Sequence, residues 1–190
     1  MRITGGEFGG RNLKVPKSDA IRLTQDRVRE ALFNIIQCEV AGSEFLDLFA
    51  GSGAVGIEAL SRGAKQVTFV ERERRHLAVL KENLGPLGGL GGAGGVDARC
   101  ETVGADAYRW IASYAGPGFT IGFADPPYAL GEERGYAQVL ATLAARGVIR
   151  AGGLFIAEMT AVQRAEETPG WELVRDRTYG KTRLCIWRRI

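Results

Sequence analysis

The sequence is poor in the residues that build metal sites. Its 190 residues include three widely spaced cysteines, with no Cys-x-x-Cys pair, and a single histidine. Because structural zinc and iron–sulfur sites use clustered cysteine or histidine ligands, we expect no metal site. Cys38, Cys100 and Cys185 are expected to remain reduced thiols that pack as small apolar side chains.

Long apolar runs are missing as well. No stretch approaches the roughly 20 residues that cross a bilayer, and the N-terminal residues, from Met1 to Gly6, form no apolar signal segment. Hydrophobic residues nevertheless make up 45% of the chain, which is enough for a packed core. We therefore expect a cytoplasmic, monomeric protein of one compact domain with short extensions and no contact with membranes.

Charge is unevenly distributed, although the net charge is only +3. Residues 1–29 hold seven basic and three acidic side chains, and residues 171–190 hold six basic and two acidic side chains. Each end therefore carries +4, and the remaining middle carries −5, which is the net charge less the two ends. Basic ends on an acidic body indicate contact with a polyanion, with ordinary solvated charge as the alternative.

The middle of the chain alternates between strand and helix patterns. In chain order we expect a strand at 44–48, a helix at 55–62, a strand at 66–70, a helix at 73–84, a strand at 99–103, a helix at 106–114, a strand at 120–124, a helix at 133–145 and a strand at 153–158. Such alternation predicts a parallel sheet with helices on both faces. The fold class is thus α/β and doubly wound.

Both ends depart from this alternation. Residues 2–15 read as a short hairpin, and Val28, Ala31, Leu32, Ile35 and Ile36 form the apolar stripe of the helix that follows. Residues 171–188 read as an antiparallel hairpin, which brings the expected sheet to seven strands. Residues 1–40 would then form an extension of a domain at 41–190. The glycine-rich stretch 85–95 is expected to end the preceding helix at Gly85-Pro86.

A glycine turn follows the first expected strand. Gly51, Gly53 and Gly56 match the dinucleotide fingerprint G-x-G-x-x-G between a strand and a helix, and Glu71 ends the second strand, where a carboxylate can hold ribose hydroxyls. The pattern predicts a nucleoside-containing cofactor. A valine at Gly53 is expected to fill space that this ligand needs.

The charge of Asp47 discriminates between two such cofactors. NAD would place its pyrophosphate at the glycine turn, close to this carboxylate, which is unfavourable in a partly dry site. S-adenosylmethionine carries no phosphate but has a sulfonium and an ammonium group, which a carboxylate favours. Asp106, after the third strand, is expected to contact the adenine amine, with a helix cap as the alternative.

The tetrapeptide Asp125-Pro126-Pro127-Tyr128 directly follows the fourth strand, where ligands bind in open α/β sheets. Its prolines present carbonyl oxygens rigidly, and Asp125 adds a carboxylate, so the segment can accept the N–H groups of an exocyclic amine. Tyr128 offers a face on which a base can stack. This arrangement predicts methylation of a nucleic-acid base by positioning and electrostatics.

The tetrapeptide resembles the signature of amino-methyltransferases that act on adenine, cytosine or guanine. Further segments resemble the bacterial methyltransferases that modify guanine N2 in small-subunit (16S) ribosomal RNA: Ile3-Thr4-Gly5-Gly6, Arg11-Asn12-Leu13, residues 26–34, residues 46–53 and residues 58–64. The likeness spans nearly the whole chain. Where family members usually have Arg-Pro-Thr, this chain has Arg22-Leu23-Thr24, and the glycine stretch at 85–95 is also atypical.

The resemblance implies a Rossmann-like, S-adenosylmethionine-dependent enzyme whose residues 1–40 bind RNA and whose residues 41–190 form the methyltransferase domain. The expected partner is ribosomal RNA or the assembling small ribosomal subunit. The expected catalytic residues are Asp125, Pro126, Pro127 and Tyr128. The expected cofactor-binding residues are Asp47, Phe49, Ala50, Gly51, Ser52, Gly53, Glu71 and Asp106. The expected RNA-binding residues are Arg11, Lys14, Arg22, Arg27, Arg29 and Asn34. An adenine-N6 methyltransferase and, more distantly, an NAD-dependent oxidoreductase remain alternatives.

Overall fold

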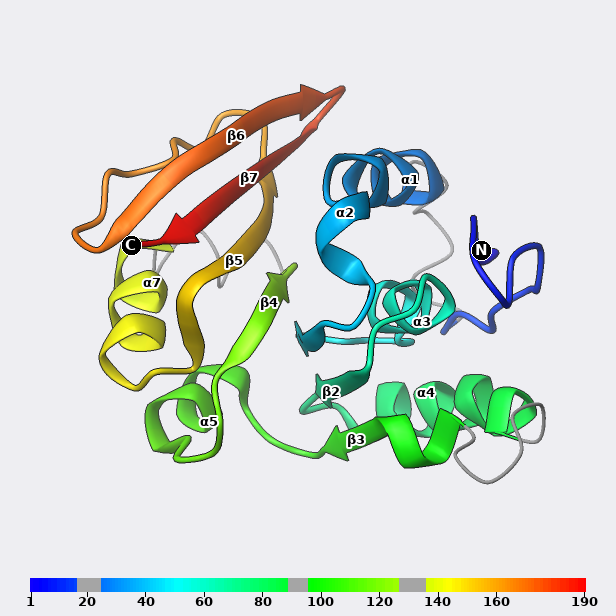
Figure 1. Cartoon of the computed structure of the whole chain (residues 1–190). Coiled ribbons are helices and arrows are strands. Elements are labelled where there is room, and N and C mark those ends of the chain that lie inside the picture. The colour runs from blue at the N-terminus through cyan, green and yellow to red at the C-terminus, as the bar shows by residue number, and fades with distance from the viewer. Residues whose placement is uncertain (17–24, 89–95, 127–135) are drawn as a thin grey trace. The chain divides into compact units, whose positions relative to one another are not determined.

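The computed structural model describes residues 1–16, 25–88, 96–126 and 136–190 (Figure 1). In chain order the elements are α1 (Gln25–Ile35), α2 (Gln37–Val40), β1 (Glu44–Leu48), α3 (Ala54–Ser61), β2 (Gln66–Val70), α4 (Arg74–Gly88), the 3-10 helix η2 (Val96–Arg99), β3 (Cys100–Val103), α5 (Ala107–Ser113), β4 (Phe119–Ala124), α7 (Tyr136–Ala145), β5 (Ile149–Thr160), β6 (Trp171–Tyr179) and β7 (Thr182–Arg189). Every strand expected between residues 44 and 188 is present.

The sheet has seven strands in the order β3-β2-β1-β4-β5-β7-β6. The pairs β1–β2, β2–β3 and β4–β5 are parallel, whereas β5–β7 and β6–β7 are antiparallel. The predicted fold class, a mostly parallel doubly wound sheet closed by an antiparallel hairpin, is therefore confirmed. Contacts divide the chain into two compact units, Met1–Ala105 and Asp106–Ile190. The predicted functional boundary near residue 40 stays a prediction.

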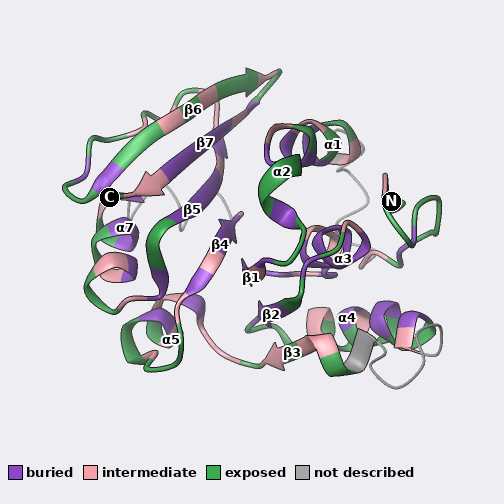
Figure 2. Ribbon diagram, viewed as in Figure 1, coloured by how far each residue is buried: buried purple, intermediate pink, exposed green. Residues whose placement is uncertain are grey.

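The core of the first unit lies around β1 and β2, which are purple in Figure 2 because nearly all their residues are buried. Their apolar runs, such as Phe45-Leu46 and Phe69-Val70, suit a parallel strand that is covered on both faces. Helix α3 packs closely on β2, where Gly56 faces the ring of Phe69. This packing fixes the helix that begins at the glycine turn.

The N-terminal segment is attached to α3. Its predicted hairpin consists of one antiparallel bridge, Arg2 to Asn12, and the side chains of Ile3 and Phe8 are buried. Ser61 of α3 accepts the backbone N–H groups of both Glu7, on its carbonyl at 2.7 Å, and Phe8, on its Oγ at 2.9 Å. The segment is thus part of the packed structure of the first unit.

Helix α4 extends beyond the predicted end at Gly85-Pro86 and continues to Gly88. The backbone φ that a proline ring imposes is compatible with a helix, and the cost of Pro86 is the lost hydrogen bond to the carbonyl four residues earlier. Leu84 and Leu87 are buried on either side of Pro86, and their packing holds the last turn in place. The remainder of the glycine-rich stretch, residues 89–95, lies outside the described residues.

The second unit packs α7 against β5 and β7. An aromatic cluster forms its core: ring centroids of Tyr136, Phe155 and Trp187 lie 6.3 Å from one another. Trp171 packs edge-on against Phe155 and donates its Nε1–H to the Leu140 carbonyl at 2.9 Å. The predicted C-terminal hairpin is confirmed.

Across the described ranges, no helix is long and apolar enough to cross a membrane. In the same part of the chain, no group of three or more His, Cys, Asp or Glu side chains is placed to hold a metal ion.

Candidate cofactor and active site

The turn between β1 and α3 has an unusual backbone. Gly51 (φ 56°) and Gly53 (φ 84°) adopt the left-handed conformation, and Phe49 (φ 61°) adopts it without being a glycine. Such a conformation costs a residue with a Cβ about 1–2 kcal/mol, so it persists only where the surroundings enforce it. Strained residues of this kind are concentrated at ligand sites, which makes the turn a candidate site.

The three fingerprint glycines serve different purposes. A Cβ on Gly56 would lie 2.3 Å from Cε1 of Phe69, and one on Gly53 would lie 2.2 Å from Cδ1 of Leu80. The space beside Gly53 is therefore filled by Leu80, and the prediction that a valine there would occupy ligand space is wrong. A Cβ on Gly51 meets nothing closer than the Phe49 carbonyl oxygen, at 4.0 Å. Gly51 is the fingerprint glycine with open space beside it.

Glu71 reaches the same turn from the end of β2. Its Oε2 accepts the Gly51 N–H at 2.8 Å, and its Oε1 accepts the Glu73 N–H at 2.7 Å. The side chain is only 7% exposed, and Nδ1 of His76 lies 3.8 Å from Oε2. The structure thus brings together Glu71 and Gly51, two residues that the sequence assigned to the cofactor.

Asp47 is 1% exposed, and its Oδ2 accepts the Gly56 N–H at 2.8 Å. This bond joins the end of β1 to the first turn of α3. The carboxylate therefore organises the glycine turn from inside the protein. Together with Glu71, it places two acidic groups at the turn, an arrangement that disfavours a bound pyrophosphate.

A residue that the sequence did not indicate, Asn83, also holds the turn. Its Nδ2 donates to the carbonyls of Ser52 at 2.9 Å and Lys14 at 3.0 Å, and its Oδ1 accepts the Lys14 N–H at 2.8 Å. Ser52 is buried, and the Ala50 N–H donates to the Val70 carbonyl at 3.1 Å. The one sequence signal for Asn83 is its place beside Leu84 on the apolar face of α4.

The second unit carries the start of the tetrapeptide. Asp125 is half-buried and Pro126 is buried directly after β4, as the sequence predicted for this strand end. Pro127 and Tyr128 lie outside the described residues. The catalytic assignment of the tetrapeptide therefore stays a prediction.

Tyr136, at the start of α7, was not identified from the sequence as a site residue. Its hydroxyl donates to the Glu158 carbonyl at 2.9 Å. Burial raises the pKa of Tyr136 far above its ordinary value, and the negative charge of Asp125 raises it further. The phenol therefore stays protonated and joins α7 to β5.

Asp106 caps α5. Its Oδ1 accepts the Arg109 N–H at 3.0 Å, as in a typical N-cap. The helix cap, which the sequence analysis gave as the alternative role of Asp106, is therefore present in the structure. A contact between Asp106 and adenine stays a prediction.

Several predicted RNA-binding side chains are exposed, namely Arg11, Lys14, Arg27 and Asn34. The Arg11 guanidinium lies 5.6 Å from the centroid of the Phe8 ring, and Lys14 forms an exposed ion pair with Glu82 at 3.0 Å. Arg22 lies outside the described residues.

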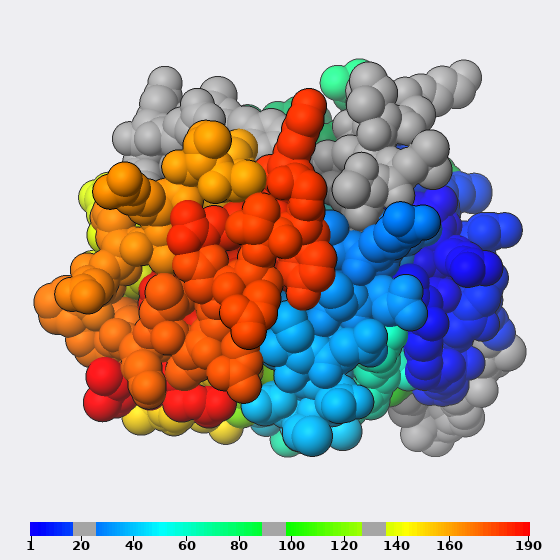
Figure 3. Space-filling model, turned by 90° about the horizontal axis from the view of Figure 1, so that it is seen from above, coloured from blue at the N-terminus to red at the C-terminus, as the bar shows by residue number. Residues whose placement is uncertain are grey.

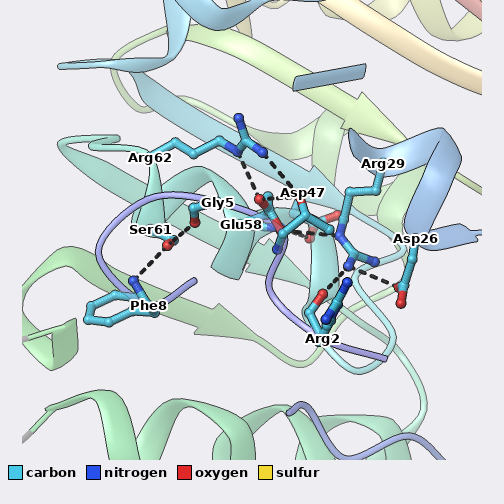
Figure 4. A network of polar contacts seen from close by, with 11 residues as sticks. Arg2, Gly5, Phe8, Asp26, Arg29, Asp47, Glu58, Ser61 and Arg62 are labelled. Carbon is cyan, nitrogen blue, oxygen red and sulfur yellow. Dashed lines mark hydrogen bonds and ion pairs between the residues drawn. The ribbon is translucent and has the colours of Figure 1, made fainter. Parts of the chain in front are cut away.

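Arg29 was predicted to bind RNA, but its side chain is only 4% exposed. Its Nε lies 3.4 Å from Oε2 of Glu58, and its Nη2 donates to Asp26 at 3.0 Å and to the Arg2 carbonyl at 2.5 Å (Figure 4). All of these partners are internal to the first unit. Arg29 therefore organises the N-terminal segment and cannot contact RNA in this conformation.

Glu58 is the centre of this network and is fully buried. Besides Arg29, it accepts the N–H of Thr4 at 2.8 Å, the hydroxyl of Thr4 at 2.7 Å and the Nε–H of Arg62 at 2.8 Å. Four donors meet the roughly four acceptor positions of a carboxylate, so the buried charge is fully satisfied. The network joins the N-terminal segment, α1 and α3.

Comparison with known proteins is consistent with this fold and turn. Over 190 residues the chain is 33% identical to "Ribosomal RNA small subunit methyltransferase D" of Escherichia coli. The matched region covers 100% of this chain and 90% of the relative. The solved structure of yhhF from Escherichia coli superposes with a TM-score of 0.84 at 31% identity, covering 100% of this chain and 97% of the other. SMU.776, solved in complex with SAH, shares the fold, with a TM-score of 0.67 at 18% identity over 87% of this chain and 49% of that one.

The fold and the glycine turn define the class: the protein has the Rossmann-like fold of a methyltransferase. Within this class, the chain belongs to the family described as "Conserved hypothetical protein 95", whose model matches residues 1–188. The resemblance to ribosomal RNA methyltransferases is thereby confirmed, and the oxidoreductase alternative has no support.

Proposed function

We propose that the protein methylates the exocyclic N2 amine of a guanine in small-subunit ribosomal RNA, using S-adenosylmethionine as methyl donor. The observation that carries the proposal is the full-length similarity to a relative that is named as a small-subunit ribosomal RNA methyltransferase. The choice of guanine N2 rests on the family resemblance of the sequence, including the segment before the glycine turn.

The first unit fits this cofactor. Gly51 leaves open space beside the backbone, and Glu71 and Asp47 give the turn two carboxylates. S-adenosylmethionine would supply a methyl group activated by a sulfonium charge, which such an acidic site stabilises. Asp47 and Glu71 hold the turn in shape, and Gly51 allows close approach of the ligand. Asp106 would then contact the adenine amine.

The second unit supplies the groups that would receive the base. Asp125 and the carbonyls of the tetrapeptide would accept the amine N–H groups, so that the nitrogen lone pair is freed from conjugation with the ring. Tyr128 would stack on the base, as in other single-strand complexes. Tyr136 stays neutral near Asp125 and would hold this strand end in place. Catalysis then consists of positioning and electrostatic stabilisation.

The test is transfer of a labelled methyl group to 16S ribosomal RNA from a strain that lacks this protein, followed by digestion to nucleosides. The expected product is N2-methylguanosine at one position. Label found only in N6-methyladenosine would overturn the guanine assignment, and absence of transfer to both naked RNA and assembled small subunits would overturn the ribosomal RNA assignment.

A further inference from the structure

The C-terminal hairpin presents a row of charges that the proposed function does not yet use. Strand β6 stands at the end of the sheet order, and most of its residues are exposed (green in Figure 2). From Arg175 onward its pairing with β7 is regular, with Arg175 opposite Ile186, Arg177 opposite Leu184 and Tyr179 opposite Thr182.

Regular pairing places Arg175, Arg177 and Tyr179 on one face of β6, because side chains two residues apart in a strand point the same way. Consecutive members of the row are about 6.6 Å apart along the strand. This step is comparable to the repeat of phosphates along an extended nucleic-acid strand. Lys181 follows in the turn, whose backbone is held by a bond of 2.9 Å from the Ala161 N–H to the Lys181 carbonyl.

Among the described residues the cations of this row form no ion pair, although the charge of Arg177 contributes to lowering the pKa of Asp176. The carboxylate of Asp176 binds Arg183 through two hydrogen bonds, of 2.7 and 2.5 Å, on the opposite face of the hairpin. In the described part of the chain, Arg175 and Arg177 donate to the carbonyls of Val174 and Asp176. Over the described ranges, no ion pair joins Arg175, Arg177 or Lys181 to a carboxylate.

We propose that Arg175, Arg177, Tyr179 and Lys181 bind an extended single-stranded segment of the RNA substrate, the cations contacting successive phosphates and Tyr179 stacking on a base. This inference rests on the proposed function for the identity of the ligand. The hairpin lies at the molecular surface, orange and red in Figure 3, so a strand has access to it. Sequence-tolerant contacts of this kind position RNA without reading its bases.

The chemistry of β6 also predicts where the contact ends. The loop before β6 and the beginning of the strand carry exposed carboxylates at Glu166, Glu167 and Glu172. These groups would repel phosphates, so the RNA segment is confined to the half of β6 from Arg175 to the turn. The net charge of the hairpin surface therefore changes from negative to positive along β6, which would not be so on a uniformly basic surface.

The test compares the full-length protein with two variants of equal charge change, Arg175→Gln/Arg177→Gln and the control Lys81→Gln/Arg109→Gln, whose side chains are exposed elsewhere. Binding of an unstructured fluorescent RNA oligonucleotide is measured across a salt series. Loss of two phosphate contacts is expected to reduce the slope of log K against log salt by about 1.4 in the hairpin variant, and to leave the control at the wild-type slope.

Tyr179 provides an independent readout. Tyr179→Ala is expected to weaken binding of the oligonucleotide about tenfold, whereas Tyr179→Phe, which retains a stacking face, should bind like the wild type. Calorimetry with S-adenosylmethionine and thermal melting verify that each variant is folded. Wild-type slope and affinity in the hairpin and Tyr179→Ala variants, with methylation of ribosomal RNA intact, would overturn this inference alone. If the wild type neither binds nor methylates RNA, both this inference and the proposed function are overturned.

Discussion

Nε of Arg29 lies 3.4 Å from Oε2 of Glu58, inside the first unit, and both side chains are buried. Removing one partner of a buried pair leaves an uncompensated charge, which costs more than the pair itself contributes. The N-terminal segment therefore depends on this contact for its place on α3.

Glu58→Gln should lower the free energy of unfolding by about 3–5 kcal/mol, because the buried Arg29 and the partly exposed Arg62 lose their shared carboxylate. Urea denaturation measures the change. The control is Glu82→Gln, which removes an exposed ion pair with Lys14 and should cost no more than about 1 kcal/mol. Equal effects of the two substitutions would contradict the structural role of Glu58.

Gly51→Ala and Gly53→Ala should separate ligand space from packing. Gly51→Ala should cost about 1–2 kcal/mol of stability, through its left-handed backbone, and reduce affinity for S-adenosylmethionine. Gly53→Ala should be more destabilising, since its Cβ collides with Leu80. Thermal melting and calorimetry distinguish the two effects. Unchanged cofactor affinity in a folded Gly51→Ala variant would count against the assigned site.

Asp125→Asn should lower the turnover number by about 10²–10³, because the substitution removes the negative charge and replaces one acceptor oxygen at the reacting amine by an NH2 donor. The affinity for S-adenosylmethionine should change little. Glu39→Gln, at an exposed acidic residue of α2, serves as the control. Single-turnover methylation of ribosomal RNA provides the measurement, and a wild-type rate for Asp125→Asn would refute its catalytic role.

The C-terminal hairpin should respond to acid through Asp176. Hydrogen bonds from Arg183 hold the pKa of Asp176 below its usual value, so the stabilisation is fully present above about pH 4 and is lost as the pH falls through the lowered pKa. Asp176→Asn should therefore cost about 0.2–1 kcal/mol at neutral pH. Urea unfolding across the acidic range should show the difference from wild type vanishing; a difference independent of pH would rule out this linkage.

The cysteines should differ in reactivity. Burial raises the pKa of Cys185 to about 12 and the side chain is inaccessible, whereas Cys38 is exposed. Iodoacetamide at mildly alkaline pH should therefore modify Cys38 in the folded protein, and Cys185 only after denaturation. Mass spectrometry identifies the modified residues. Rapid labelling of native Cys185 would show that the hairpin opens readily.

The strands could be predicted well from the sequence, because buried parallel strands such as 44–48 and 66–70 are short apolar runs between turn residues, and the observed bounds are the same. Strand β5 is longer than predicted. The prediction began the strand at Gly153, whereas the strand begins at Ile149, and its pairing with β4 is irregular between these two residues. Local sequence does not reveal that a neighbouring strand tolerates such an irregularity.

The error at Arg29 has a related cause. The predicted apolar stripe of α1 contained Ala31 and Ile35, which are only half-buried, whereas Arg29 and Phe33 are buried. The stripe is rotated because α1 packs where Glu58 can compensate a charge. From the sequence alone a charged side chain such as Arg29 is expected at the surface, because the carboxylate that compensates it, Glu58, lies 29 positions away in the sequence. For the same reason, Asn83 and Tyr136 could be recognised only from their contacts.

The three hydrogen bonds of Asn83 have a thermodynamic consequence. One side-chain amide holds both the Ser52 carbonyl of the glycine turn and the backbone of Lys14, so the two segments share part of their ordering free energy. We expect a ligand that orders the turn to reduce the entropy cost of ordering the Lys14 segment. By reciprocity, a ligand held by that segment strengthens binding at the turn by the same factor.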